Sequence, residues 1–516
     1  MRKTLSILLS VLLTSCTLSE EPRDQIPEEK AITNASTLYQ NTVATLYSYI
    51  GGNTDGQGLQ GTCRGVYDLN TFGSDEAMLP TRGGDWFDGG IWQAMYMHSW
   101  TAGHEIPKNA WIYLYKVITL CNRSLEMLDK YIDLTSEDQY ITWHGEVRAL
   151  RAMYYWYLID LFGDVPLVTS TDVAMNQVTR EKRAVVFNFI VKELLEVREY
   201  TYYANSTKKG DFYGRMTFPV CTFLLAKLML NANVYTGQSQ TSYYQKCIEY
   251  CDQIEGLGYQ LEENYASNFH VYNEDSKENI FVIPMDRDLY TNQQQNLYRS
   301  YHYRHAAAYG FTAENGSCAT QRAMEIFGYG TEDVDLRLFY NYYVDQVYDL
   351  AGEEVTDRTG NPLVYYPMEV EMDLSGSPFV ETAGARMFKY EVDKNALKDG
   401  KLMDNDIVLF RFADVLLMRA EAKFRLGQNG QDDYDLVRQR ADMPSRPISL
   451  DNLLDERLLE LCWEGWRRQD LIRFGKYESL YDGPDKVDES DGHTTIFPIP
   501  ADVRALNQNL TQNPGY

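Results

Sequence analysis

The sequence predicts a mainly α-helical protein in which tetratricopeptide-like helix pairs support an irregular, loop-rich lobe with short strands. Over residues 107–255 and 406–475, apolar residues recur at intervals of three and four, the repeat of a helix with one buried face. Over residues 256–405 that spacing fades, and Gly, Asn, Asp, Pro and Tyr become frequent. We therefore expect a single body over residues 36–516, with a helical framework and an inserted lobe.

The chain begins with a short cationic stretch followed by an apolar segment. Arg2-Lys3 precedes the apolar run 5–13, which is too short to span a bilayer, and Cys16 follows it. This order is typical of a secretory signal, so residues 1–15 are predicted to be a signal peptide. A small residue before a cysteine also resembles the bacterial lipoprotein box. We expect acylation of Cys16 and an acidic, lipidated leader over residues 16–35.

The first group of helices follows a glycine-rich region. The expected helices span residues 108–131, 136–161, 185–199, 217–235 and 242–255. The second of them has a favourable N-cap in Ser136, acidic residues in its first turn, and Gly163 just after its end. Short connections between such helices favour antiparallel pairs.

The second group of helices is expected to begin at Ile407. The first helix continues to Phe424 and is capped by Gly427, and residues 433–441 form its returning partner. A last pair begins near Ser449. A helix, a short turn and a second helix are typical of tetratricopeptide-type repeats.

Composition excludes several classes of function. The chain has 516 residues and 74 Asp and Glu against 48 Lys and Arg, a net charge of -26, so we expect no nucleic-acid partner. Beyond the signal, no apolar run approaches the roughly twenty residues that cross a bilayer, which leaves the lipid as the expected anchor.

The cysteines do not form a disulfide framework. Seven remain besides Cys16, an odd number without paired spacing. Cys247 and Cys251 are four apart on an expected helix, but no further His or Cys lies nearby at ligand spacing. We interpret them as buried thiols and expect no metal site there.

One row of carboxylates raises the possibility of catalysis. Glu456, Glu460 and Glu464 are spaced by four on an expected helix, and crowded carboxylates serve as acid and base in glycoside cleavage. Arg457, Arg467, Arg468 and Asp470 offer charges for a structural network instead, which is the interpretation we favour.

Several ordered blocks resemble the SusD/RagB family of nutrient-binding lipoproteins. They are residues 146–152, 162–167, 411–422, 455–465, 467–475, 497–500 and 507–516. The resemblance implies a SusD-like, mainly helical fold. It also implies that the protein pairs with a SusC-like TonB-dependent transporter, sits over it as a hinged lid, and traps the ligand between the two. It implies no catalysis. We expect no cofactor. Together with the acidic leader, which is similar to the surface-export signal of Bacteroidetes lipoproteins, the resemblance implies a lipid-anchored protein exposed on the outer membrane.

The family's ligands are oligosaccharides in most members and peptides in some. Glycan capture and delivery is therefore the leading hypothesis, a RagB-like peptide receptor is the alternative, and a surface glycosidase is less favoured. The acidic surface leaves room for a structural calcium ion, although no loop has the ligand spacing of a dedicated site.

Two regions supply the candidate ligand-binding residues. Gly-rich loops supported by a rigid scaffold commonly carry binding residues, and residues 51–65 and 72–100 are one such region. Within it, Trp86 can stack on the C–H face of a sugar, while Asp85 and Asp68 accept hydrogen bonds from hydroxyls. The alternative, that Trp86 is a core residue that fixes its loop, stays open at this point.

From the lobe, Arg386 and Tyr390 form a second candidate pair, since a guanidinium can donate two parallel hydrogen bonds. The alternative is that Arg386 and Lys389 brace the lobe on the helices. The tyrosines at positions 298, 301, 303 and 309 are weaker candidates, chosen for the density of aromatic residues in one loop.

Overall fold

The computed structural model describes residues 28–204, 210–396, 399–478 and 492–516. It is mainly helical, which confirms the predicted fold class, and its strands are short. The predicted signal peptide, Cys16 and most of the predicted leader lie outside the described residues.

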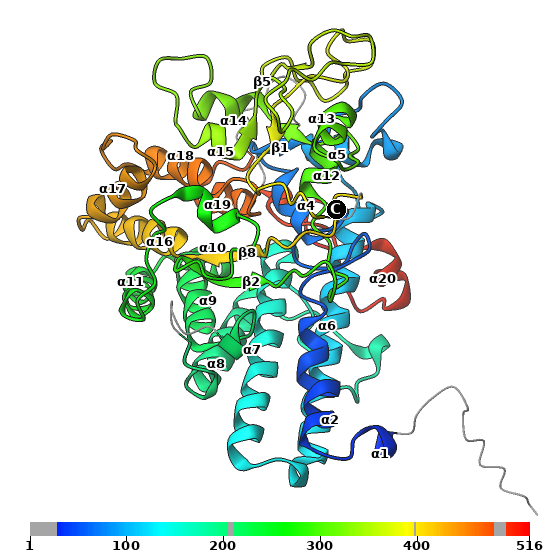
Figure 1. The fold of residues 1–516 in the computed structure, drawn as a ribbon. Coiled ribbons are helices and arrows are strands. Elements are labelled where there is room, and N and C mark those ends of the chain that lie inside the picture. The colour runs from blue at the N-terminus through cyan, green and yellow to red at the C-terminus, as the bar shows by residue number, and fades with distance from the viewer. Residues whose placement is uncertain (1–27, 205–209, 397–398, 479–491) are drawn as a thin grey trace, which may run out of the picture.

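Two long helices, α6 (Glu105–Lys130) and α7 (Glu137–Phe162), pack against each other and extend to one end of the molecule (Figure 1). The start of α7 is fixed by a capping box, in which the Ser136 hydroxyl accepts the Gln139 N–H and the Gln139 side chain accepts the Ser136 N–H. Gly163, with φ 72°, ends the helix. Both ends therefore follow the sequence signals.

Further helices continue the framework beside this pair. Helix α8 (Arg183–Val197) packs on α7, and α9 (Phe218–Leu230) packs on α11 (Thr241–Gly256). The predicted helix over residues 217–235 is thus split into α9 and α10 (Ala232–Thr236).

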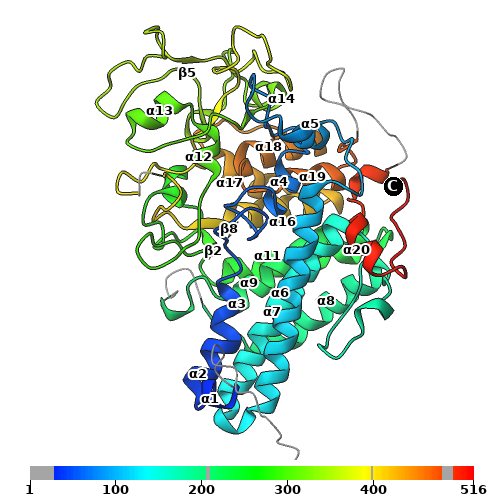
Figure 2. The ribbon, with the colours of Figure 1, turned by 90° about the vertical axis from the view of Figure 1, so that its right-hand side faces the viewer.

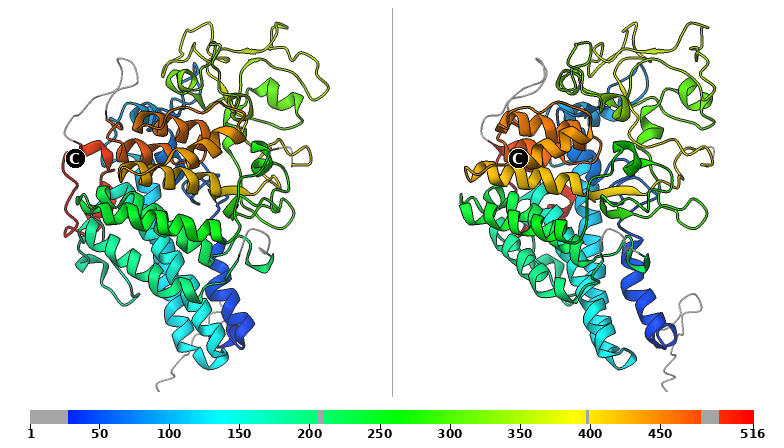
Figure 3. Two further views of the ribbon diagram at one scale, coloured as in Figure 1. Left: turned by 90° about the vertical axis from the view of Figure 1, so that its left-hand side faces the viewer. Right: turned by 60° about the vertical axis from the view of Figure 1, so that its left-hand side comes forward.

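Helices from the C-terminal part of the chain extend the same stack. They are α16 (Phe412–Arg425), α17 (Gln431–Arg440), α18 (Leu450–Leu461) and α19 (Arg467–Arg473). Helix α16 contacts α11, α17 and α18, and so joins helices from before and after the lobe. Figure 3 shows the yellow and orange helices lying above the green ones.

The prediction that a helix begins at Ile407 is wrong. Residues 407–411 form strand β8 (Ile407–Arg411), which pairs antiparallel with β2 (Asn279–Ile283). Every residue of both strands is buried. A short apolar run that is buried on both faces has no periodicity that separates strand from helix, which explains the error.

The β2–β8 ladder brings the two ends of the loop-rich segment together, with Ile283 opposite Ile407. That segment lies at one end of the molecule, away from the tips of α6 and α7 (Figure 2). It contributes strands to three further two-stranded antiparallel sheets in the described chain. These sheets are β1 (Ala77–Met78) with β3 (Cys318–Ala319), β4 (Tyr342–Tyr343) with β7 (Arg386–Met387), and β5 (Asp345–Gln346) with β6 (Val364–Tyr365).

The remaining α-helices of the described chain are short. They are α1 (Glu28–Ala31), α2 (Ala35–Tyr39), α3 (Thr45–Tyr47), α4 (Val66–Thr71), α5 (Ile91–Tyr96), α12 (Asn296–Ser300), α13 (Tyr303–Ala308), α14 (Gln321–Ile326), α15 (Leu338–Asn341) and α20 (Ala501–Leu506).

The seven cysteines after Cys16 are all buried and free, and the predicted burial of Cys247 and Cys251 is confirmed. Burial raises the pKa of Cys251 well above its ordinary value, which keeps this thiol protonated. Among the described helices, none combines the length and apolar character needed to cross a membrane.

Candidate ligand-binding site

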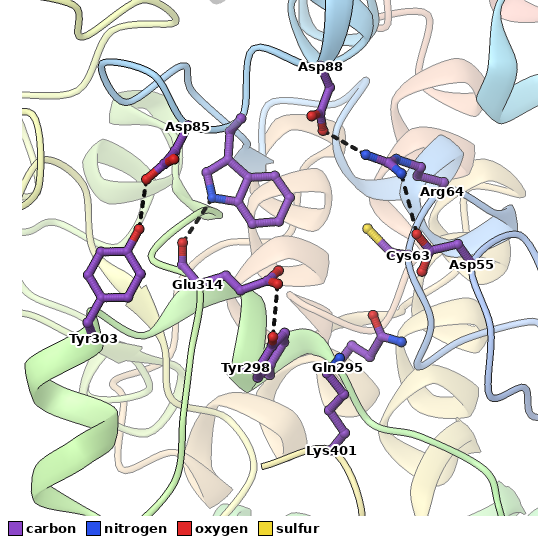
Figure 4. A pocket seen from close by; sticks show the side chains of 11 residues that line it. Asp55, Cys63, Arg64, Asp85, Asp88, Gln295, Tyr298, Tyr303, Glu314 and Lys401 are labelled. Carbon is purple, nitrogen blue, oxygen red and sulfur yellow. Dashed lines mark hydrogen bonds and ion pairs between the residues drawn. The ribbon is translucent and has the colours of Figure 1, made fainter. Parts of the chain in front are cut away.

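A cavity of about 430 Å³ lies where the N-terminal loops meet the loop-rich lobe (Figure 4). Its lining residues come from three places in the sequence. They are Asp55, Cys63 and Arg64 from the glycine-rich stretch; Asp85, Trp86 and Asp88 from the loop before α5; and Gln295, Tyr298, Tyr303, Glu314 and Lys401 from the lobe. We call this site the Trp86 cavity.

Trp86 is half-buried and held from several sides. Its backbone is left-handed, with φ 62°, and its indole Nε1–H donates to the Glu314 carbonyl oxygen at 3.0 Å. A Cβ on Gly316 would come within 2.6 Å of the indole, so this glycine allows the close approach. The ring also makes an edge contact with Trp92. The indole is therefore fixed in place while part of it lines the cavity.

Two carboxylates in the cavity wall accept hydrogen bonds from tyrosines. Tyr303 donates to Asp85 at 2.9 Å, and Tyr298 donates to Glu314 at 2.8 Å. Burial, together with the neighbouring Asp85 carboxylate, raises the pKa of Tyr303 to about 12, so its hydroxyl stays a donor. Lys401 places its ammonium 4.1 Å from the centroid of the Tyr298 ring.

The opposite wall carries an ion-pair cluster around Arg64 (Figure 4). The Arg64 guanidinium lies 2.8 Å from Asp88 and 3.5 Å from Asp55. Asp88 also accepts the Trp92 indole N–H at 2.9 Å. This cluster ties the glycine-rich stretch to the loop that carries Trp86.

Asp68, a candidate ligand contact from the sequence, does not line the Trp86 cavity. It lies on α4, is fully buried, and pairs with Arg299 at 3.0 Å. Arg299 in turn contacts the sulfur of Cys63 at 3.1 Å, and Cys63 lines the cavity. Asp68 therefore supports the cavity wall from behind.

Arg386 and Tyr390 also lie away from the cavity, and both are fully buried. Arg386 donates to Asn315 and to the Glu381 carbonyl oxygen, each at 2.9 Å. The Tyr390 hydroxyl accepts the Val408 N–H of β8 at 3.0 Å. In this structure the two side chains brace the lobe internally and against β8, and neither lines the Trp86 cavity.

Several cavity residues were not predicted. Asp88 lies in the loop that the sequence indicated, and Tyr298 and Tyr303 were weaker candidates. Glu314 and Lys401 have no local signal, because only the tertiary fold brings them to Trp86.

The row of carboxylates on α18 forms part of a buried network. Glu456 and Glu460 pair with Arg337 at 2.7 and 2.9 Å, and Glu464 pairs with Arg411 at 2.8 Å. Burial alone would raise the pKa of Glu460, but Arg440, Arg411 and Arg337 outweigh it and hold the pKa well below its ordinary value. All three carboxylates are buried and paired with arginines, which is the arrangement of a structural network.

The kind of network was predicted, but its cations were not. The arginines expected to neutralise the row have other partners: Arg457 pairs with Asp414 and Asp470, Arg467 with Asp75, and Arg468 with Asp160.

Across the described part of the chain, no group of three or more His, Cys, Asp or Glu is arranged to hold a metal ion.

The fold and this cavity define a helical scaffold that displays a ligand pocket at a junction of loops. The model of the SusD family matches residues 88–516, so the chain belongs to the SusD family. Members of this family are non-catalytic binding proteins, and this protein is accordingly a binding protein and not a glycosidase.

Relatives with related sequences support the assignment. The starch-binding protein SusD of Bacteroides thetaiotaomicron is 28% identical over 507 residues, which cover 90% of this chain and 87% of the relative. A SusD-like protein of Bacteroides ovatus is 23% identical and covers 73% of this chain and 67% of its own.

Solved structures share the fold. A laminarin-binding SusD-like protein has a TM-score of 0.72 at 22% identity, covering 94% of this chain and 100% of its own. Surface glycan-binding protein A of Bacteroides thetaiotaomicron, solved with laminarihexaose, has a TM-score of 0.74 at 19% identity and covers 93% and 100%.

Proposed function

We propose that this protein captures oligosaccharides in the Trp86 cavity and delivers them to a SusC-like TonB-dependent transporter in the outer membrane. The observation that carries the proposal is a rigid, partly exposed indole in a cavity of about 430 Å³ that is bordered by carboxylates.

The chemistry of the cavity suits a sugar. Pyranose rings present a C–H face that packs on an aromatic ring, and their hydroxyls donate to carboxylates. Asp85 and Glu314 each accept one tyrosine hydroxyl in the structure. A carboxylate has about four acceptor positions, so both keep capacity for hydroxyls of a ligand.

Two comparisons support the choice of glycan over peptide. The relative from Bacteroides thetaiotaomicron is named for starch, and a structure of the same fold holds laminarihexaose. A peptide receptor of the RagB kind stays the alternative.

A binding panel tests the proposal. The protein is assayed against amylose, laminarin, fructan and host glycans, and against a peptide library, by affinity electrophoresis and calorimetry. We expect binding to at least one glycan class and a loss of at least tenfold in affinity for Trp86→Ala. Phe87→Ala is the matched control, because Phe87 is the adjacent aromatic, is 52% exposed and does not line the cavity. Peptide binding without glycan binding would overturn the proposal in favour of the alternative.

The membrane attachment is proposed from the sequence and the family. Acylation of Cys16 would anchor the protein in the outer membrane, and the acidic leader would direct it to the cell surface, where it can meet a transporter. We expect wild-type protein to incorporate labelled palmitate and to co-purify with the transporter, and Cys16→Ser to do neither. Release of unacylated wild-type protein into the periplasm would contradict this part.

A further inference from the structure

We infer that the Trp86 cavity accepts uncharged oligosaccharides and rejects polyanionic ones, such as glycans that carry uronate or sulfate groups. This inference rests on the proposed function and names the ligand class for the same site.

The balance of charge in the lining is negative. Four carboxylates, those of Asp55, Asp85, Asp88 and Glu314, stand against two cationic side chains. The protein as a whole has a net charge of -26, so its long-range field also repels polyanions.

The cation on the Asp88 side of the cavity is already engaged. Arg64 lies between Asp88 and Asp55, and its side chain is only 28% exposed. An incoming sulfate would have to displace one of these carboxylates and would then lie beside it. Arg64 is thus a structural bridge and a poor receptor for anions.

The second cation sits in a different environment. The Lys401 ammonium lies over the Tyr298 ring, and the Tyr298 hydroxyl donates to the Glu314 carboxylate. An anion drawn to Lys401 would therefore approach Glu314 as well. Neither cation forms the bidentate arginine arrangement that proteins use for carboxylate or sulfate groups.

Hydrogen-bond chemistry leads to the same conclusion. Ionised carboxylates only accept hydrogen bonds, and the hydroxyls of a neutral sugar supply the donors they need. Where a sulfate or carboxylate group takes the place of a hydroxyl, its oxygens are acceptors too, so the cavity carboxylate that it faces loses a donor and meets a like charge.

Matched polysaccharides test the inference. Dextran, laminarin and amylose are each compared with their sulfated and carboxymethylated derivatives by calorimetry at low and high salt. We expect each derivative to bind at least tenfold more weakly than a parent glycan that binds. The difference in affinity between parent and derivative should become smaller at high salt, because salt screens repulsion between charges.

A charge variant locates the effect. The double variant Asp55→Asn and Asp85→Asn keeps the side-chain shapes and removes two negative charges. We expect it to reduce the affinity ratio between parent glycan and anionic derivative at least threefold. Glu249→Gln combined with Asp172→Asn removes the same net charge at exposed positions outside the cavity lining and should leave the difference unchanged.

The outcomes separate the two proposals. If a sulfated or carboxymethylated glycan binds as tightly as its parent or more tightly, the charge inference is wrong while glycan binding stands. If none of these polysaccharides, their derivatives or the glycans of the binding panel above binds, the proposed function fails and the inference fails with it.

Discussion

The Asp68 carboxylate and the Arg299 guanidinium form an ion pair at 3.0 Å with almost no contact with solvent. The pair joins α4 to α12, and Arg299 also contacts Cys63 in the cavity wall. A residue that the sequence offers as a ligand contact is therefore part of the support of the site.

Asp68→Asn should destabilise the protein by about 3 kcal/mol, because it leaves the Arg299 charge buried without a counter-charge. Urea unfolding measures the free energy. Asp133→Asn, at an exposed position, should change it by less than about 0.5 kcal/mol. An equal effect of the two substitutions would show that the buried pair has no special weight.

Gly316→Ala should weaken glycan binding at least tenfold, since its Cβ would come within 2.6 Å of the Trp86 indole and push the ring out of position. We expect a stability cost of about 1–3 kcal/mol from the overpacking. Binding is measured by calorimetry and the indole environment by tryptophan fluorescence. Gly84→Ala is the matched control, because nothing lies within 4 Å of the added methyl group.

Glu76→Gln should stabilise the protein at pH 8 by about 4 kcal/mol. Burial raises the pKa of Glu76 to about 8, whereas a carboxyl in the unfolded chain titrates near 4.5. The preference of the folded protein for the protonated carboxyl therefore stabilises it fully below pH 4.5. This stabilisation is lost as the pH rises from 4.5 through the folded pKa of about 8. Thermal melting of both proteins at pH 4 and pH 8 measures it. A gain of equal size at both pH values would contradict the assigned protonation.

Acid should remove the stabilisation that the ionised Asp470 carboxylate provides. Burial alone would raise the pKa of Asp470, but Arg457 and Arg473 outweigh it and lower the pKa to about 2 from an ordinary 3.8. A group with a depressed pKa stabilises the fold above its unfolded pKa and loses that effect as the pH falls through the folded value. We expect about 2 kcal/mol to disappear between pH 4 and pH 2.

Denaturant unfolding across that pH range checks the effect. The Asp470→Asn variant starts lower at neutral pH and should lose about 2 kcal/mol less on acidification than the wild type. Parallel acid curves for the two proteins would assign the acid sensitivity to other carboxylates.

The helical framework could be predicted because its signals are local. The cap at Ser136, the stop at Gly163 and the three- and four-residue spacing are all contained within one helix. Residues 407–411 were misassigned because pairing with β2, more than a hundred residues away, decides their conformation.

The lining of the Trp86 cavity could be predicted only in part, for a similar reason. Asp85 and Trp86 stand out in a glycine-rich loop and line the cavity. The burial of Asp68, Arg386 and Tyr390 depends on what the fold stacks over them, and the sequence near each residue carries no sign of it.

The β2–β8 ladder has a consequence for how the protein can diversify. The chain leaves the helical framework at β2 and returns to it at the adjoining β8, so the segment between these strands can be exchanged while the packing of the helices is kept. Yet Asp55, Arg64, Asp85, Trp86 and Asp88 come from outside that segment. Exchange of this segment between related proteins would therefore change only part of the cavity lining. The contribution of the remaining lining residues to ligand specificity would stay that of the recipient protein.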